Sequence, residues 1–375
     1  MRSPSSAAPL RLAILGPGKV AHTHARAVLA CPQAKLEAVI GRNPQRTRDF
    51  AAAHGARPLG SLDEALEDDA VDAVIICTPH PLHADAAVKA AQAGRHVLVE
   101  KPLATTSADC DRISEAAARS GATVAVVSQR RLYEPAQRVR AAIETGKIGR
   151  PVLAVATLLG WRGPDYYSMD AWRGTWAGEG GGVLINQAVH QIDMLLWFMG
   201  PAVEVHGYVA NQSHPTIEVE DTAVANIRFA CGALGSIVAS NSQNPGLWGR
   251  VHVHGSNGAS VGVQTDGGSS FVAGVTSVLE PPVNDLWTVP GEEGLLASWQ
   301  EEDRARAAHL DVAEHYHHLL LADFVDAVLS GSAPLVSAAE GRRATELIEA
   351  IYHSSRSGRS VRLGGSQDLP PGPEI

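Results

Sequence analysis

The stretch LRLAILGPGKVAHTHARAV, residues 10–28, decides the fold of this chain. An apolar strand is followed directly by a helix, and Gly16, Gly18 and Ala21 form a GxGxxA pattern between them. Gly16 permits a tight turn, Gly18 lets the backbone approach a pyrophosphate, and Ala21 lets the helix pack closely on the strand. This context predicts a dinucleotide-binding turn, with an ordinary strand-to-helix turn as the alternative. The expected cofactor contacts at the turn are Gly16, Pro17, Gly18, Lys19 and Val20.

The pattern around this turn predicts the fold class and the domains. From Leu10 to Gln129 apolar strands alternate with amphipathic helices, which is typical of a doubly wound parallel sheet. After Gln129 one helix is followed by a succession of strands, which indicates a mostly antiparallel sheet in an α+β domain. We therefore expect an α/β protein with a Rossmann domain at 10–130, an α+β substrate-binding and oligomerisation domain at 131–363, and flexible tails at 1–9 and 364–375. Residues 266–310 are expected to form a surface excursion, and helices at 315–329 and 338–353 to close the second domain.

The composition excludes several function classes. With 45% hydrophobic and 19% charged residues the chain is expected to be globular and soluble, and it has no apolar run long enough to span a bilayer. The net charge of −9 argues against nucleic-acid binding. Residues 1–9 lack the apolar segment of a secretory signal, and the 4 cysteines have no ligand spacing, so we expect a cytoplasmic protein with reduced thiols. The histidines match no zinc pattern, and no metal is expected.

The end of the second strand bears on the choice of cofactor. NAD-binding folds usually place an acidic residue there to bind the ribose 2′-hydroxyl, whereas this chain has Gly41, Arg42 and Asn43. No acid would repel a 2′-phosphate, and the planar guanidinium of Arg42 can bind one. The sequence therefore favours NADP(H) over NAD(H), with a solvated surface arginine as the alternative interpretation.

A second informative stretch is EGGGVLINQAVHQID, residues 179–193. If a helix begins at Asn186, then Asn186, His190 and Asp193 lie along one face of it. A histidine between an amide and a carboxylate is a candidate proton-transfer group. Asp193 is expected either to hold His190 or to pair with a basic residue elsewhere.

Three motifs together resemble the Gfo/Idh/MocA family of NAD(P)-dependent oxidoreductases. They are TPxxxH at 78–83, EKP at 100–102 and the GGGxxxNxxxHxxD run at 180–193. The resemblance extends from Leu10 to about Leu363. It implies hydride transfer between a nicotinamide and a secondary hydroxyl or ketone of a sugar, a nucleotide sugar or an inositol-like polyol. It also implies that Lys101 and His190 are the catalytic pair.

These two residue types suit the chemistry. Oxidation of a hydroxyl requires removal of its proton as the hydride leaves, and histidine titrates near neutrality. Lys101, expected at the carboxyl end of a strand, can stabilise the same oxygen. Many family members carry an aspartate four residues before the histidine, where this chain has Asn186. A charged relay through that position is therefore in doubt, although the amide can still bind substrate or cofactor.

The remaining candidates surround these motifs. An aromatic cluster at 161–176, interleaved with charged residues, suits a sugar ring, or alternatively forms an aromatic plug under a loop. Further cofactor contacts are expected from Thr78, Pro79, His83, Glu100, Lys101, Gln129, Trp172 and Arg173. Substrate contacts are expected from Lys101, Trp161, Tyr166, Arg173, Asn186, His190 and Tyr316.

The resemblance leaves two rival functions and an assembly question open. Some relatives cleave glycosides by transient oxidation with bound NAD, and a non-enzymatic dinucleotide-binding sensor is the other alternative. Relatives that form dimers or tetramers lead us to expect a homodimer or homotetramer.

Overall fold

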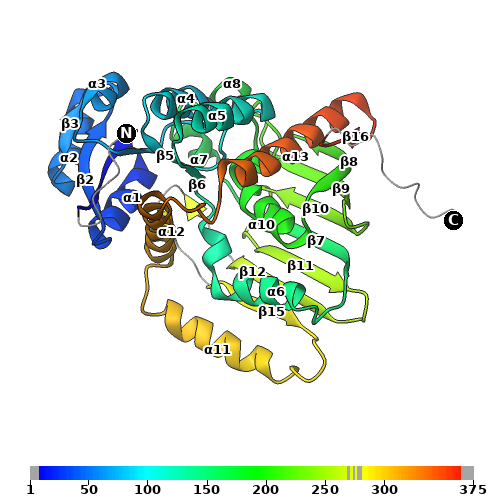
Figure 1. Cartoon of the computed structure of the whole chain (residues 1–375). Helices are drawn as coiled ribbons and strands as arrows, with labels where there is room; N and C mark the ends of the chain where they lie inside the picture. The colour runs from blue at the N-terminus through cyan, green and yellow to red at the C-terminus, as the bar shows by residue number, and fades with distance from the viewer. Residues whose placement is uncertain (1–7, 268–270, 273–274, 277–280, 365–375) are drawn as a thin grey trace.

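The computed structural model describes residues 8–267, 271–272, 275–276 and 281–364. The described residues form two large sheets with their helices and a small two-stranded ribbon. Figure 1 shows how the two large sheets are arranged. The tails expected at 1–9 and 364–375 lie, except for residues 8, 9 and 364, outside the described residues.

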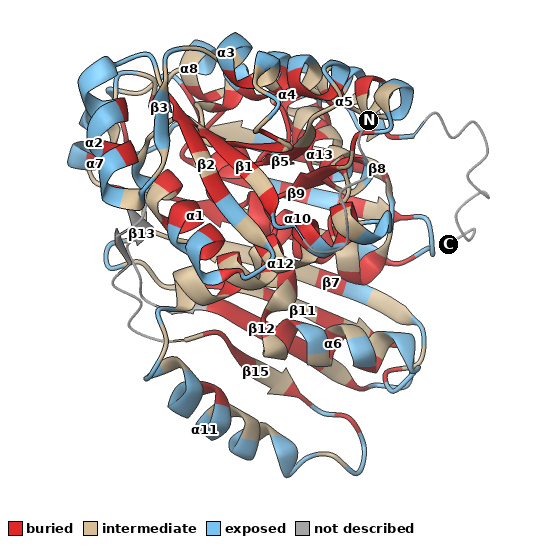
Figure 2. Ribbon diagram, turned by 60° about the vertical axis from the view of Figure 1, so that its left-hand side comes forward, coloured by how far each residue is buried: buried red, intermediate tan, exposed pale blue. Residues whose placement is uncertain are grey.

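The first sheet has six strands, all parallel, in the order β3-β2-β1-β4-β5-β6. Its central strands are apolar because helices cover both faces, and β1 and β2 are largely buried in Figure 2. The strands are β1 (Leu10–Leu15), β2 (Ala34–Ile40), β3 (Arg57–Leu59), β4 (Ala73–Ile76), β5 (His96–Val99) and β6 (Val124–Val126). The helices are α1 (Lys19–Ala30), α2 (Pro44–His54), α3 (Leu62–Glu67), α4 (His83–Gln92) and α5 (Ser107–Ser120), with a 3-10 turn η1 (His80–Leu82).

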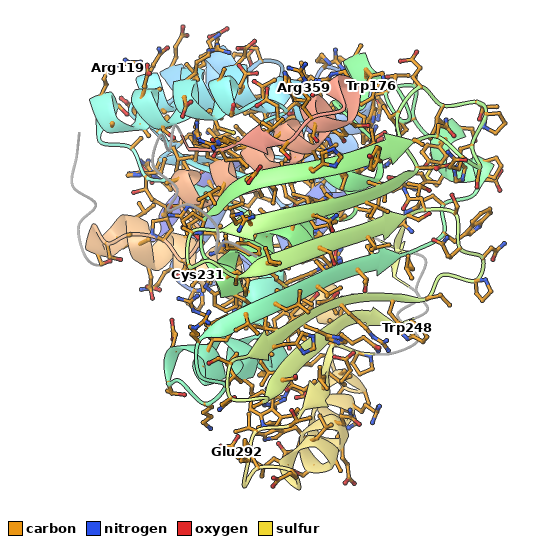
Figure 3. The ribbon with its side chains drawn as sticks, turned by 90° about the vertical axis from the view of Figure 1, so that its right-hand side faces the viewer. Arg119, Trp176, Cys231, Trp248, Glu292 and Arg359 are labelled. Carbon is orange, nitrogen blue, oxygen red and sulfur yellow. The ribbon has the colours of Figure 1, made fainter. Side chains whose placement is uncertain are left out.

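The second sheet has eight strands in the order β15-β12-β11-β7-β10-β9-β8-β16, antiparallel except where β7 pairs with β10. Buried and exposed residues alternate along β9 and β11, because helices cover only one face and the other faces the viewer in Figure 3. The strands are β7 (Pro151–Leu159), β8 (Ala202–Ala210), β9 (Thr222–Phe229), β10 (Leu234–Ser240), β11 (Trp248–Gly255), β12 (Ser260–Gly267), β15 (Val283–Trp287) and β16 (Val361–Arg362). The covering helices are α6 (Glu134–Glu144), α10 (Val189–Met199) and α13 (Ala338–Ser357).

Short elements connect the sheets or lie between them. They are η2 (Gln129–Leu132), α7 (Pro164–Ser168), α8 (Trp176–Glu179), α9 (Val183–Asn186) and a small ribbon of β13 (Phe271–Val272) and β14 (Val275–Thr276). The predicted fold class, a parallel Rossmann sheet followed by a mostly antiparallel sheet, is confirmed. No helix in the described ranges combines the length and apolar character that a bilayer crossing requires.

Two expectations about the second domain were wrong. Helix α12 (Val312–Ser330) does not simply close the second domain: it packs on α1, and its Leu321 and Phe324 belong to the apolar core of the first sheet. Residues 268–270, 273–274 and 277–280 of the excursion expected at 266–310 lie outside the described residues, and its described part contains the edge strand β15 and the helix α11 (Leu295–Ala307). The segment as a whole is rich in Gly, Ser, Pro and acidic residues, and this average composition hid the short strand VNDLW and a run of good helix formers.

A buried ion pair joins elements that are far apart in the sequence. The Arg131 guanidinium on η2 donates to both carboxylate oxygens of Asp193 on α10, at 2.8 and 2.6 Å. Its third contact is with Glu340 on α13, at 3.0 Å. Because the Arg131 and Asp193 side chains are 3% and 6% exposed, removing one leaves the other charged and desolvated.

The substitution Arg131→Ala is therefore expected to lower the free energy of unfolding by about 3–5 kcal/mol, since it leaves the Asp193 carboxylate unpaired. Urea unfolding measures the loss. The control Arg119→Ala removes an exposed i,i+4 ion pair with Glu115 and should cost about 0.5 kcal/mol or less. Equal effects of the two substitutions would contradict a structural role for the buried pair.

Candidate active site

One cavity of about 730 Å³ lies between the first sheet and the helices and loops of the second. Its lining includes the turn after β1, the residues that follow β2, β4 and β5, and residues of α10 and of the 158–173 segment. Every residue expected to contact the cofactor lines this cavity: Gly16, Pro17, Gly18, Lys19, Val20, Gly41, Arg42, Asn43, Thr78, Pro79, His83, Glu100, Lys101, Gln129, Trp172 and Arg173. The arrangement brings them together, while their individual roles stay predictions.

The turn after β1 fits a pyrophosphate. Gly16 has φ of +96°, and a Cβ atom there would lie 2.9 Å from the carbonyl oxygen of Cys77. Gly18 is the N-cap of α1 with no side-chain cap, and the first turn of that helix carries no acidic residue. The N–H groups at the start of α1 are thus left for an anion, which the positive end of the helix dipole also favours.

Beyond this turn, two arginines line the cavity where β2 ends. Arg42 follows the strand, and Arg46 lies in the first turn of α2, whose N-cap is Asn43. Both arginines are exposed. Sequence reasoning missed Arg46, although its i+4 spacing from Arg42 was a usable signal.

The acid of the EKP motif is held by histidines. Glu100 is buried, its carboxylate lies 2.8 Å from His24 Nε2 and 3.8 Å from His317 Nε2, and it accepts from the Lys101 backbone N–H. Although burial opposes ionisation, the hydrogen bond with His24 and the nearby His317 ring hold the pKa of Glu100 well below its usual range. One ring nitrogen each of His24 and His317 and a carboxylate oxygen of Glu100 lie within 4.8 Å of one another, a grouping of possible metal ligands. The spacing of the histidines along the sequence did not predict this cluster.

Lys101 crosses from the first sheet to the glycine-rich segment. Its Nζ donates to the backbone oxygen of Asn186 at 2.9 Å and to the Asn186 side-chain oxygen at 3.3 Å. Burial lowers the pKa of Lys101 to about 8, against the opposing charge of Glu100. The ammonium is therefore still the main form at neutral pH.

His190 is buried and lines the same cavity. Burial, with the nearby Arg130 and Lys101 charges, lowers the pKa of His190 well below its usual value. The ring is consequently neutral at pH 7 and has a nitrogen lone pair that can accept a proton.

The single helix expected from Asn186 onward was wrong. Helix α9 ends at Asn186 and α10 begins at Val189. The carbonyl of Val183 accepts from both Gln187 and Ala188, so the hydrogen-bond ladder shifts from i+4 to i+5 and the helix is interrupted. Asn186 and His190 nevertheless both line the cavity.

Three predicted site residues are placed elsewhere. Asp193 does not hold His190, because both of its oxygens bind Arg131. The Tyr316 hydroxyl donates to Glu134 on the side of α12 that meets α6, and its neighbour His317 is the one that lines the cavity. Trp161 stacks on His214 outside the lining.

Tyr166, expected to contact the substrate, lines the cavity, and its role there stays a prediction. Its hydroxyl oxygen accepts from Arg173 Nη1 at 2.5 Å and from Asn186 Nδ2 at 3.0 Å, and the Arg173 guanidinium lies over its ring. Arg162, one of the charged residues of the cluster predicted at 161–176, also lines the cavity. Sequence reasoning missed other polar lining residues, which have no local motif: Arg130, Gln187, Asn241 and Thr265.

Comparisons with known proteins agree with this site. Residues 10–128 match the model of an oxidoreductase family with an NAD-binding Rossmann fold, and residues 136–261 match the GFO/IDH/MocA C-terminal domain. The chain is 28% identical to myo-inositol 2-dehydrogenase of Thermotoga maritima over 94% of this chain and 98% of that protein. It is 32% identical to scyllo-inositol 2-dehydrogenase (NAD(+)) of Bacillus subtilis over 67% of this chain and 72% of the relative.

A solved structure is similar over nearly the whole length. The WlbA dehydrogenase from Bordetella pertussis, in complex with NADH and UDP-GlcNAcA, superposes with a TM-score of 0.85 at 30% identity, covering 97% of this chain and 100% of the other. Two family models that adjoin along the chain and a full-length structural match thus agree with the three motifs. The chain belongs to the Gfo/Idh/MocA family of oxidoreductases with an NAD-binding Rossmann domain.

Proposed function

We propose that this protein is an NAD(P)-dependent dehydrogenase or ketoreductase that acts on a secondary hydroxyl or ketone of a sugar, nucleotide sugar or inositol-like polyol. The observation that carries the proposal is the shared cavity. Lys101 reaches it from the first sheet, His190 reaches it from α10, and the phosphate-binding turn after β1 opens into it.

The protonation states of the two side chains support the reaction. A bound nicotinamide dinucleotide would accept or supply the hydride. In the oxidative direction the neutral His190 ring takes the hydroxyl proton, while the Lys101 ammonium donates a hydrogen bond to the same oxygen and stabilises its developing negative charge. In the reductive direction His190 returns the proton. Burial of both side chains keeps water from competing with these contacts.

The lining supports a polyhydroxylated substrate. Tyr166 and Trp172 offer aromatic surface for the C–H faces of a sugar ring, and Arg162 and Arg173 offer donors for hydroxyl or anionic groups. The relatives named above act on inositols, and the WlbA structure holds a nucleotide sugar acid. These relatives support a polyol or nucleotide-sugar substrate for this chain.

The site favours NADP(H). Arg42 and Arg46 line the part of the cavity that follows β2, and the segment Gly41–Asn43 has no carboxylate to repel a 2′-phosphate. Both guanidiniums can donate paired hydrogen bonds to such a group.

We also propose that the protein is a cytoplasmic homodimer or homotetramer. The open face of the second sheet exposes the apolar side chains of Tyr208, Val224 and Leu234. A second copy of the chain, placed face to face, would cover this surface. The molar mass in solution, from light scattering, tests this assembly.

The substitution Lys101→Ala is expected to lower kcat about 100- to 1000-fold, because one donor to the developing oxyanion is lost. The dissociation constant of the cofactor should change little. Turnover on a panel of inositols, sugars and nucleotide sugars, with cofactor binding by fluorescence, measures both effects. The exposed Lys147→Ala variant is the control, and undiminished turnover by Lys101→Ala would refute the catalytic assignment.

The substitution Arg42→Ala is expected to weaken NADPH binding about 10-fold, since a charge-assisted contact contributes about 1.5 kcal/mol or more. NADH binding should be nearly unchanged. Calorimetric titration of both cofactors decides this, with the exposed Arg48→Ala on the following helix α2 as the control. Tighter binding of NADH than of NADPH by the unmodified protein would contradict the proposed preference.

A further inference from the structure

The amide of Asn186 is hydrogen-bonded at both ends by ionisable side chains. Its oxygen accepts from Lys101 Nζ at 3.3 Å, and its Nδ2 donates to the carboxylate of Glu179. An amide offers one acceptor and one donor end, so only this orientation satisfies both neighbours. Asn186 therefore connects the Lys101 ammonium to the Glu179 carboxylate, which lies behind the lining of the cavity.

Burial and several hydrogen bonds hold Glu179 in place. Glu179 is the last residue of α8 and is only 1% exposed to solvent. Its second carboxylate oxygen accepts a hydrogen bond from the Gly174 backbone N–H at 2.6 Å. Its backbone oxygen also accepts from His80 Nδ1 at 2.9 Å. Among the described residues no lysine or arginine forms a direct ion pair with the Glu179 carboxylate. Its contact toward the cavity runs through the amide of Asn186.

We propose that Glu179 is a positioning residue for Lys101: through the Asn186 amide, its carboxylate holds the ammonium charged and directed at the reacting oxygen. The inference rests on the proposed function, because it assigns Lys101 a reacting oxygen to contact. It also answers the question that Asn186 raised in the sequence. Glu179 adds to the negative charge of Glu100 at this site, and it acts on Lys101 through the neutral amide of Asn186.

The geometry explains why asparagine, and not aspartate, suits position 186 in this chain. Charged partners at both ends of the amide polarise it in the same direction, so each hydrogen bond strengthens the other. An aspartate at 186 would instead place two carboxylates in contact, and one of them would have to take up a proton. An amide at position 186 therefore suits a carboxylate at position 179.

The charges around Lys101 show what the carboxylate contributes. Burial lowers the pKa of Lys101, and the charges of Arg130 and Arg173 lower it further, whereas Glu100 and Glu179 raise it. The neighbouring His190 and His80 rings are buried and neutral. Burial also raises the pKa of Glu179, against the hydrogen bonds from Gly174 and Asn186. Removal of the Glu179 charge consequently favours loss of the Lys101 proton.

The test uses Glu179→Gln, which keeps the size of the side chain and removes its charge. The titration of Lys101 is read in the protein without cofactor, from the pH dependence of its acetylation by acetic anhydride, measured by peptide mass spectrometry. We expect the pH midpoint of the Lys101 titration to be about one unit lower in Glu179→Gln than in the unmodified protein. The alkaline limb of kcat/KM should shift by the same amount, a loss of about 10-fold on that limb.

Two further variants separate this role from a purely structural one. Glu218→Gln removes an acid from the connection between β8 and β9, where Glu218 accepts from the Trp176 backbone N–H of α8 outside the cavity, and should leave the midpoint unchanged. The double variant Glu179→Gln/Asn186→Asp moves the carboxylate next to Lys101 and should restore both the midpoint and kcat/KM. A general loss of packing would not be rescued in this way.

The outcomes are distinguishable. An unchanged Lys101 midpoint in Glu179→Gln, or a double variant that melts normally and recovers neither readout, overturns the inference. If Glu179→Gln does not fold, Asn186→Asp alone remains informative: the midpoint must rise, and kcat/KM must fall at neutral pH because the two carboxylates share a proton. A shifted midpoint in a protein with no turnover on any substrate would support the positioning role and reject the proposed function.

Discussion

The hydrogen bonds from Lys101 to Asn186 are the contact on which the site depends. Lys101 follows β5 of the first sheet, and Asn186 ends a short helix of the second part of the chain, so the bonds of 2.9 and 3.3 Å join the two parts of the chain in the lining of the cavity. Asn186 is in turn held by Tyr166 and Glu179. The position of the ammonium relative to His190 is therefore set by the packing of the two parts of the chain, and the buried Arg131–Asp193 pair secures α10 in that packing.

Burial then sets the charge states. It drives His190 to its neutral form and leaves Lys101 largely protonated at pH 7, so a proton acceptor and a cationic donor coexist in one cavity. The positive charge of Lys101 disfavours protonation of the nearby His190. This repulsion suits the reaction, because His190 must be neutral to accept a proton. Glu100, which lines the cavity, and Glu179, which lies behind Asn186, supply the compensating negative charge.

Much of this arrangement could be predicted from the sequence, because glycine turns, strand–helix alternation and short motifs are local signals. The GxGxxA turn, EKP and the histidine run indicated the two-sheet fold and the residues around the cavity. The partners of those residues could not be predicted, because they depend on tertiary packing. Asp193 bonds to Arg131, Glu100 bonds to His24, and α12 packs into the apolar core of the first sheet. The spacing of residues along the chain gives no signal for these contacts. The interruption between α9 and α10 also escaped prediction, since the apolar periodicity continues through it.

The central claim is that Lys101 and His190 act on the same oxygen atom of the substrate. A crystal structure of the protein with a nicotinamide cofactor and a polyol or sugar substrate tests this most directly. The account predicts that the oxygen on the carbon facing C4 of the nicotinamide lies within hydrogen-bond distance of both Lys101 Nζ and a His190 ring nitrogen. A substrate whose reacting oxygen contacts neither side chain, or only side chains other than these two, would contradict it.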